Sequence, residues 1–151
     1  MKKQTKLILG GSVIVTVVLL IGILFIINSK NVNSSPKNVA KGIMQAEANN
    51  DVDAFLKCIS KEQLSESMAK ENESETELRK GLAQEIKNHS NDIKKTINNV
   101  TFNEETYSNN ATTVDVVAKY KDKSITVPTY KGDDGNWYVD IEFLNKILWK
   151  V

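Results

Sequence analysis

An apolar run near the start of the chain limits its possible folds more than any other feature. The run LILGGSVIVTVVLLIGILFII covers Leu7–Ile27, which is 21 residues without a charged side chain. As a helix it would extend about 32 Å, enough to cross a hydrocarbon core about 30 Å thick. The sequence therefore predicts a signal-anchor transmembrane helix over residues 1–28. Its membrane-embedded side chains include Leu7, Ile14, Leu20, Phe25 and Ile27.

The flanks of this run predict its orientation. Three lysines, Lys2, Lys3 and Lys6, precede it on the short N-terminal side. By the positive-inside rule, the N-terminus then lies in the cytoplasm and the rest of the chain lies outside the cell membrane, which the chain crosses once. A cleaved secretory signal is an alternative, although it would have a shorter apolar region followed by small residues, whereas FIINSKN follows here. Whether the anchor is cleaved stays open.

The charge balance of the remaining chain excludes some classes of partner. Beyond Lys30 the chain holds 16 Lys and Arg against 19 Asp and Glu, a net charge of about −3. A nucleic-acid-binding domain would show a basic patch, so no nucleic-acid partner is expected. The lone cysteine, Cys58, has no partner for an internal disulfide and is interpreted as a packing residue beside an apolar helix face.

The first half of the extracytoplasmic part has a helical period. After a polar linker over residues 29–35, Ser35 is a helix cap and Pro36 suits the first helical position. Asp51 is expected to cap a second helix. Residues 61–74 predict a marginal helix, and a firmer helix follows from Glu75. We therefore expect one α+β domain over residues 36–151.

The second half changes to a period of two, which is typical of strands. Alternating apolar residues predict an antiparallel sheet of about four strands, packed against about three helices. Pro128 lacks an amide hydrogen, so its strand is expected to lie at an edge or a bulge there. The terminal EFLNKILWKV suits either a short closing helix or an extended tail, with Trp149 in the core.

The stretch KGDDGNWYVDI, Lys131–Ile141, most resembles a metal-binding loop. A calcium loop spreads several oxygen ligands at regular spacing and ends with a bidentate acid, whereas Gly, Asn, Trp and Tyr follow Asp134. The stretch therefore predicts a tight turn, with Gly132 or Gly135 supplying a positive φ. The only histidine, His89, has no second histidine or cysteine at ligand spacing, so zinc is not expected. The clustered acids Glu71, Glu73, Glu75 and Glu77 are interpreted as a solvated run, with a weak cation site as the alternative, and no metal or cofactor is assigned.

Several of these features together resemble the nuclear-transport-factor-two-like superfamily. They are the helix starting at Ser35-Pro36, the pattern AEANNDVDAFLKCIS over Ala46–Ser60, a further helix, a run of strands, and the late Asp-Gly-Asn-Trp turn. The nearest likeness is to small, membrane-anchored extracytoplasmic bacterial members of unknown function. The resemblance implies a cone-like domain, in which a curved antiparallel sheet wraps around helices and leaves a pocket at one end. Enzymes of the superfamily use an acid or histidine dyad there, and this sequence offers no matching pair.

Two classes of function fit these features. The first is a non-enzymatic domain that binds a protein, a peptide or an envelope component outside the membrane, such as an accessory or immunity-like protein. Its weak candidate binding residues are Tyr107, Tyr120, Tyr130 and Tyr138. The second is a small-ligand binder or enzyme that uses the pocket, with Asp115 or Asp140 as a general base. No catalytic residue is assigned, and the Lys, Asn and Ile usage is typical of a Gram-positive bacterium.

Overall fold

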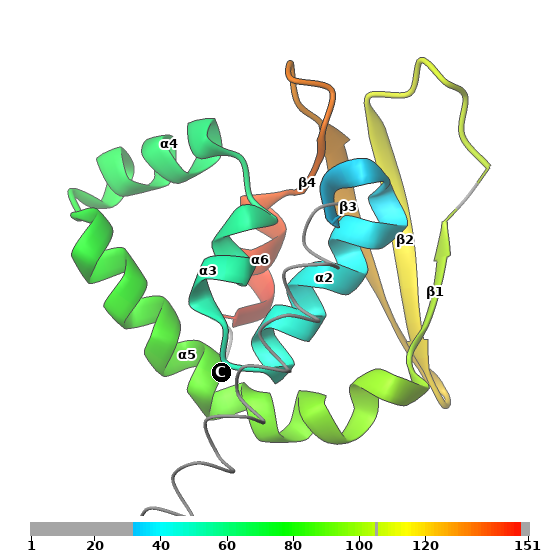
Figure 1. Cartoon of the computed structure of the whole chain (residues 1–151), viewed down its shortest axis with the longest axis horizontal. Coiled ribbons are helices and arrows are strands. Elements are labelled where there is room, and N and C mark those ends of the chain that lie inside the picture. The colour runs from blue at the N-terminus through cyan, green and yellow to red at the C-terminus, as the bar shows by residue number, and fades with distance from the viewer. Residues whose placement is uncertain (1–31, 105, 149–151) are drawn as a thin grey trace, which may run out of the picture. The chain divides into compact units, whose positions relative to one another are not determined.

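The chain folds into an antiparallel sheet with helices against one face (Figure 1). This computed structural model describes residues 32–104 and 106–148. The strands are β1 (Thr101–Glu104), β2 (Thr113–Tyr120), β3 (Lys123–Lys131) and β4 (Trp137–Val139), in the spatial order β1-β2-β3-β4. The α-helices are α2 (Pro36–Ala48), α3 (Val52–Lys57), α4 (Lys61–Glu71), α5 (Glu75–Thr96) and α6 (Ile141–Leu148), and two short 3-10 turns are η1 (Val32–Ser34) and η2 (Ile97–Asn99).

The α+β class and the four antiparallel strands are confirmed, but the described residues form five α-helices rather than about three. The other two are segments that the sequence predicted only as a marginal helix, residues 61–74, and as one of two alternatives for the terminal segment. One is α4, which has little apolar surface. The other is α6, which settles the choice between a closing helix and an extended tail for residues 141–148.

Side-chain caps fix where the first two helices begin. The hydroxyl of Ser35 accepts a hydrogen bond from the backbone N–H of Asn38 at 3.1 Å, with Pro36 at the first helical position. The carboxylate of Asp51 accepts one from the N–H of Ala54 at 2.9 Å. Both caps satisfy backbone donors that the helix itself leaves unpaired, and both predictions are confirmed.

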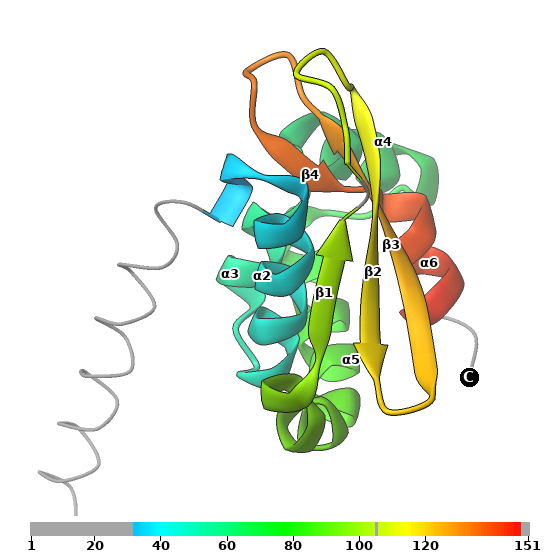
Figure 2. The ribbon, with the colours of Figure 1, turned by 90° about the vertical axis from the view of Figure 1, so that its right-hand side faces the viewer.

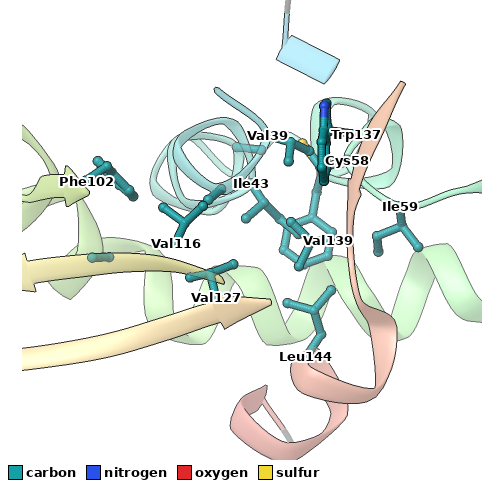
Figure 3. Close-up of a cluster of buried hydrophobic side chains, with 14 of the residues drawn as sticks. Val39, Ile43, Cys58, Ile59, Phe102, Val116, Val127, Trp137, Val139 and Leu144 are labelled. Atoms are coloured by element: carbon teal, nitrogen blue, oxygen red, sulfur yellow. The ribbon is translucent and has the colours of Figure 1, made fainter. Parts of the chain in front are cut away.

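The inner face of the sheet is filled by side chains. Alternate strand residues point toward α2 and are buried, whereas the opposite face carries no helix in Figure 2. Figure 3 shows Val116 and Val127 from the sheet facing Ile43 of α2, with Val139 and Leu144 close by. The buried sheet residues are Phe102, Val114, Val116, Ala118, Val127, Thr129, Trp137 and Val139.

The position of Pro128 shows how β3 tolerates a missing amide hydrogen. Strand β3 lies between β2 and β4, but β4 pairs only with Thr129–Lys131. Just beyond that pairing, the carbonyl of Pro128 accepts a hydrogen bond from the N–H of Asp140 at 3.1 Å. Strand β3 is therefore central in the sheet order and its register with β2 continues through Pro128, so the prediction of an edge or a bulge there was wrong. The proline lies where the β3–β4 pairing ends.

The described fold begins inside the segment that was expected to be linker. The side-chain amide of Asn33 donates hydrogen bonds to the backbone oxygens of Trp137 at 2.7 Å and Lys57 at 3.1 Å. Val32 packs against α2 at Gly42, where a Cβ atom would collide with Cγ2 of Val32. Residues from Val32 onward form one compact unit, and it contains the whole sheet, the described core and the helix caps, so it has what a domain needs to fold by itself.

Two predictions fall outside the described residues. They are the transmembrane helix over residues 1–28 and the core position of Trp149. Among the helices of residues 32–104 and 106–148, none combines the length and the apolar character needed to cross a membrane.

Candidate functional site

Helix α4 forms one wall of the candidate site and packs loosely on the rest of the domain. It begins where the hydroxyl of Ser60 accepts a hydrogen bond from the N–H of Gln63 at 3.2 Å, and it ends at Asn72 in a left-handed conformation with φ 52°. None of its residues is buried. Its two large apolar side chains, Leu64 and Met68, are half-buried and lie one turn apart, so only a narrow edge of α4 faces the domain.

Helix α5 turns back from the end of α4 through a reciprocal cap. The hydroxyl of Ser74 accepts a hydrogen bond from the N–H of Glu77 at 3.3 Å, and the Glu77 carboxylate accepts one from the N–H of Ser74 at 2.9 Å. This capping box fixes the start of α5, so that α4 and α5 meet at an angle with α3 and α6 across from them (Figure 1).

A single side chain links the first turn of α4 to the start of α6. The side-chain oxygen of Gln63 accepts a hydrogen bond from the backbone N–H of Ile141 at 3.1 Å. The carboxylate of Asp140 accepts one from the N–H of Glu142 at 2.9 Å, within the same helix start. Helix α6 is thereby positioned opposite α4.

Between these four helices lies a groove with a volume of about 780 Å³, which we call the α4 groove. Ligand pockets in proteins typically measure about 300–1,000 Å³, so this groove is large enough to receive several side chains. Fourteen of the described residues line it; eight of them are large and apolar, and none belongs to a strand. They are Phe55, Leu56, Ile59, Leu64, Leu78, Leu82, Ile141 and Leu144.

The polar part of the lining is acidic. Glu71, Glu73 and Glu77 line the α4 groove near the α4–α5 turn, together with Ser67, Asn72 and Gly81, and no described lysine, arginine or histidine lines it. We call the three glutamates the acidic rim. Hydrogen bonds from Ser74 lower the pKa of Glu77, which keeps this carboxylate ionised.

The α4 groove differs in place from the pocket that the cone resemblance implied. That pocket would lie on the concave side of the sheet, but there the side chains of the sheet and α2 pack together. Phe55, Ile59, Leu82 and Trp137 are all buried in this core. The first three also form part of the groove floor, so the groove lies on the helical side of the same core.

The structure brings together two of the four candidate tyrosines. The rings of Tyr130 on β3 and Tyr138 on β4 lie side by side, with centroids 5.9 Å apart. Tyr107 instead packs edge-on against Trp137 at 5.7 Å, and Tyr120 lies at the β2–β3 hairpin with the Lys121 ammonium 5.2 Å from its ring centroid. The four residues therefore occupy three separate places, and a binding role for any of them stays a prediction.

The Tyr130–Tyr138 pair lies in polar surroundings. The hydroxyl of Tyr138 donates to Asp134 at 2.7 Å, and burial together with this acceptor raises the pKa of Tyr138 to about 12. The hydroxyl of Tyr130 is buried near Ser60, but it forms no hydrogen bond with any described residue. Burial raises the pKa of Tyr130 as well, so both phenols remain neutral well above neutral pH.

Asp134 belongs to the turn that the sequence predicted. Its carboxylate accepts hydrogen bonds from the backbone and side-chain nitrogens of Asn136 at 3.0 and 2.8 Å, and from Tyr138. Gly135 has φ +80°, a conformation that favours glycine. These bonds hold the pKa of Asp134 below its usual range, and the prediction of a tight turn is confirmed.

The remaining candidate groups lie apart from the α4 groove. Cys58 is buried with its thiol 3.4 Å from the carbonyl oxygen of Ala54, and burial raises its pKa to about 12, which confirms its packing role. His89 lies on α5, with Nε2 3.8 Å from the carboxylate of Glu85. Asp115 is exposed on the uncovered face of the sheet. Within residues 32–104 and 106–148, no three His, Cys, Asp or Glu side chains cluster to hold a metal ion.

The most perturbed acid is one that the sequence analysis did not single out. Glu47 on α2 is only 9% exposed, and burial raises its pKa to about 7. Glu47 follows Ile43 by one helical turn on the buried face of α2. The spacing of four residues from this apolar residue is therefore a sequence signal for a buried acid. Glu47 is not among the residues that line the α4 groove.

Comparisons with protein-family models, with curated proteins and with solved structures found no match. The chemistry and geometry of the α4 groove are therefore the basis for a functional proposal.

Proposed function

We propose that the chain is a membrane-tethered domain of the bacterial envelope that binds a segment of a protein or peptide partner in the α4 groove. The observation that carries this proposal is an apolar groove with one loosely packed wall. Helix α4 has no buried residue, although Leu64 and seven other large apolar side chains line the space beneath it. Four of these eight side chains, Leu56, Leu64, Leu78 and Ile141, are only half-buried. Apolar surface that stays accessible in this way is typical of a binding site for a complementary apolar group.

The acids near the groove support binding rather than catalysis. A general base works best with a pKa near the working pH, which usually requires burial. The groove acid with a resolved shift, Glu77, is exposed and has a lowered pKa, whereas Glu47, whose pKa is raised, lies elsewhere. The proposal is therefore a non-enzymatic binding domain that needs no cofactor.

We also propose that the fold is a cone-like member of the nuclear-transport-factor-two-like superfamily. Its support is that α2 packs along the inner face of a four-stranded antiparallel sheet, with buried Val39 and Ile43 against the strands. A binding site on the helical side would then be a departure from the pocket used by the enzymes of that superfamily.

The extracytoplasmic location rests on the apolar run Leu7–Ile27 and on the lysines before it. With the anchor in the cell membrane, the domain from Val32 onward would meet partners on the extracellular side of that membrane. A protein or peptide partner is favoured over nucleic acid because the part of the chain beyond Lys30 is mildly acidic.

A titration with a neutral probe peptide tests the binding function. The probe is an amphipathic helix of about five turns made of Leu and Gln, added to an isotopically labelled Val32–Val151 fragment. The expected result is that methyl signals of Leu56, Leu78 and Leu82 shift, while those of Val117 on the opposite side of the sheet do not.

Two variants make the test specific to the groove. Leu78→Glu places a charge in the groove lining and is expected to abolish the shifts. Its matched control is Ile125→Glu, at an exposed apolar residue of β3, which is expected to leave binding unchanged. Equal loss in both variants would contradict the proposed function, and so would an absence of groove shifts with this probe and with basic and acidic probes of the same length.

A further inference from the structure

We infer that the partner segment is cationic as well as apolar, so that the α4 groove takes an amphipathic segment whose Leu-like side chains are flanked by lysine or arginine. This inference rests on the proposed function and adds the charge of the partner to it. It follows from the way in which charge is distributed around the groove.

The charged side chains that line the groove are all acidic among the residues that the structure describes. Glu71, Glu73 and Glu77 lie at the end near the α4–α5 turn, while Ile141 and Leu144 of α6 contribute apolar surface from the opposite wall. A bound segment would therefore meet an apolar floor along most of the groove and carboxylates at one end. Opposite charge on the partner is the complement that such a surface favours.

Two of the three carboxylates are available for a partner. Glu77 already accepts hydrogen bonds from the N–H and the hydroxyl of Ser74 at 2.9 and 2.7 Å. Neither Glu71 nor Glu73 forms an ion pair with any lysine, arginine or histidine of the described residues. A cationic side chain from outside would therefore not have to displace an existing partner.

The backbone adds to the negative potential at this end. Glu71 is the last residue of α4, where the helix dipole places partial negative charge on unpaired carbonyl groups. An acid at this position is unfavourable for the isolated helix. Lys70 in the same turn offsets part of the charge but is exposed and does not line the groove.

The same charges disfavour the main alternative occupant, a lipid. Anionic headgroups would be repelled by the acidic rim, and membrane-binding surfaces instead carry lysine and arginine around their apolar residues. A protein segment with alternating apolar and basic character is the better complement.

Three probe peptides of equal length and apolar content test the inference. They are amphipathic helices of about five turns that combine Leu with Lys, Leu with Gln, or Leu with Glu. Binding to the Val32–Val151 fragment is followed by methyl shifts in the groove and by titration calorimetry. We expect the Lys peptide to bind about three- to tenfold more tightly than the Gln peptide, the Glu peptide to bind more weakly still, and added salt to remove the difference.

Paired charge-neutralising variants locate the effect. Glu71→Gln combined with Glu73→Gln removes the two available carboxylates and is expected to bring the Lys peptide to the affinity of the Gln peptide. The matched control combines Glu66→Gln with Asp122→Asn, at two exposed acids outside the groove lining, and is expected to keep the preference. A preference lost equally in both pairs would mean that net charge alone causes it, which would overturn the inference.

The outcomes separate this inference from the proposed function. Equal groove binding of the Lys and Gln peptides would overturn the cationic partner and leave the binding function standing. Failure of all three peptides to shift groove signals would overturn both. If neutral phosphatidylcholine vesicles shift the groove signals and the peptides do not, the occupant is lipid and the inference is wrong. If the double variant folds poorly, the effect of salt on the parent fragment still tests the inference. A preference for the Lys peptide that does not fall with added salt would contradict it.

Discussion

The side-chain amide of Asn33 donates a hydrogen bond to the backbone oxygen of Trp137, 2.7 Å away, and so joins the start of the described fold to the strand β4. The same amide reaches the carbonyl of Lys57 at the end of α3. One polar side chain thereby connects three segments that are far apart in the sequence.

Replacing Asn33 by alanine is expected to lower the free energy of unfolding by about 1–2 kcal/mol, because two backbone carbonyls lose their side-chain donor. Chemical denaturation of the Val32–Val151 fragment measures this change. The control is Asn109→Ala, at an exposed position in the turn after β1, which should stay within about 0.5 kcal/mol of the parent. Equal effects of the two substitutions would contradict a role for the Asn33 bonds.

The contact between Val32 and Gly42 predicts a non-additive pair of substitutions. Gly42→Ala alone should destabilise the domain, because the new Cβ collides with Val32 and displaces η1. With Val32→Ala also present, the same change should become neutral or stabilising by up to about 1 kcal/mol, since alanine favours a helix more than glycine does. A double-mutant cycle measured by denaturation checks this, and additive effects would show that the contact is not formed.

Burial of Glu47 predicts a pH-dependent stability. Its pKa is raised from 4.5 to about 7 in the folded state, so the folded protein binds more protons than the unfolded chain between these values. The contribution of Glu47 to the free energy of unfolding is therefore largest below about pH 4.5. This contribution falls by up to about 3 kcal/mol as the pH rises to about 7. Glu47→Gln should flatten this dependence in denaturation curves, whereas Glu66→Gln should preserve it. A slope unchanged in Glu47→Gln would assign the effect to another group.

The bond between Asp134 and Tyr138 predicts a shift in the alkaline titration of the tyrosines. Burial and the Asp134 carboxylate together raise the pKa of Tyr138 to about 12. Asp134→Asn keeps the acceptor for the N–H of Asn136 but removes the charge, so the pKa of Tyr138 should fall. Tyrosinate absorbance during a pH titration follows this change. An identical titration in both proteins would contradict the assigned hydrogen bond.

Local signals in the sequence were sufficient for the elements whose ends are capped by side chains. Ser35 and Asp51 start their helices through bonds to backbone groups three residues away, and Gly135 supplies the positive φ of its turn. The strands followed from the alternation of apolar residues, which the sheet buries on its inner face. These features depend on neighbours in the chain, so they can be read without the tertiary structure.

The α4 groove could not be predicted in the same way. Its lining comes from four helices, and each apolar residue, such as Leu64 or Leu78, fits an ordinary core-facing stripe when the sequence is considered alone. Which apolar faces stay uncovered depends on how far α4 stands from the other helices, and that distance is a tertiary property. The packing of Val32 was missed for a similar reason, because it depends on the absent side chain of Gly42.

The connection of Val32 and Asn33 to the domain has a mechanical consequence. Tension on the chain upstream of Val32 must first break the two hydrogen bonds of Asn33 and lift Val32 from Gly42. Only then does it reach the cap of α2 at Ser35. A domain held by its N-terminal side would therefore resist pulling first at Val32 and Asn33, before the load reaches the buried residues of the core.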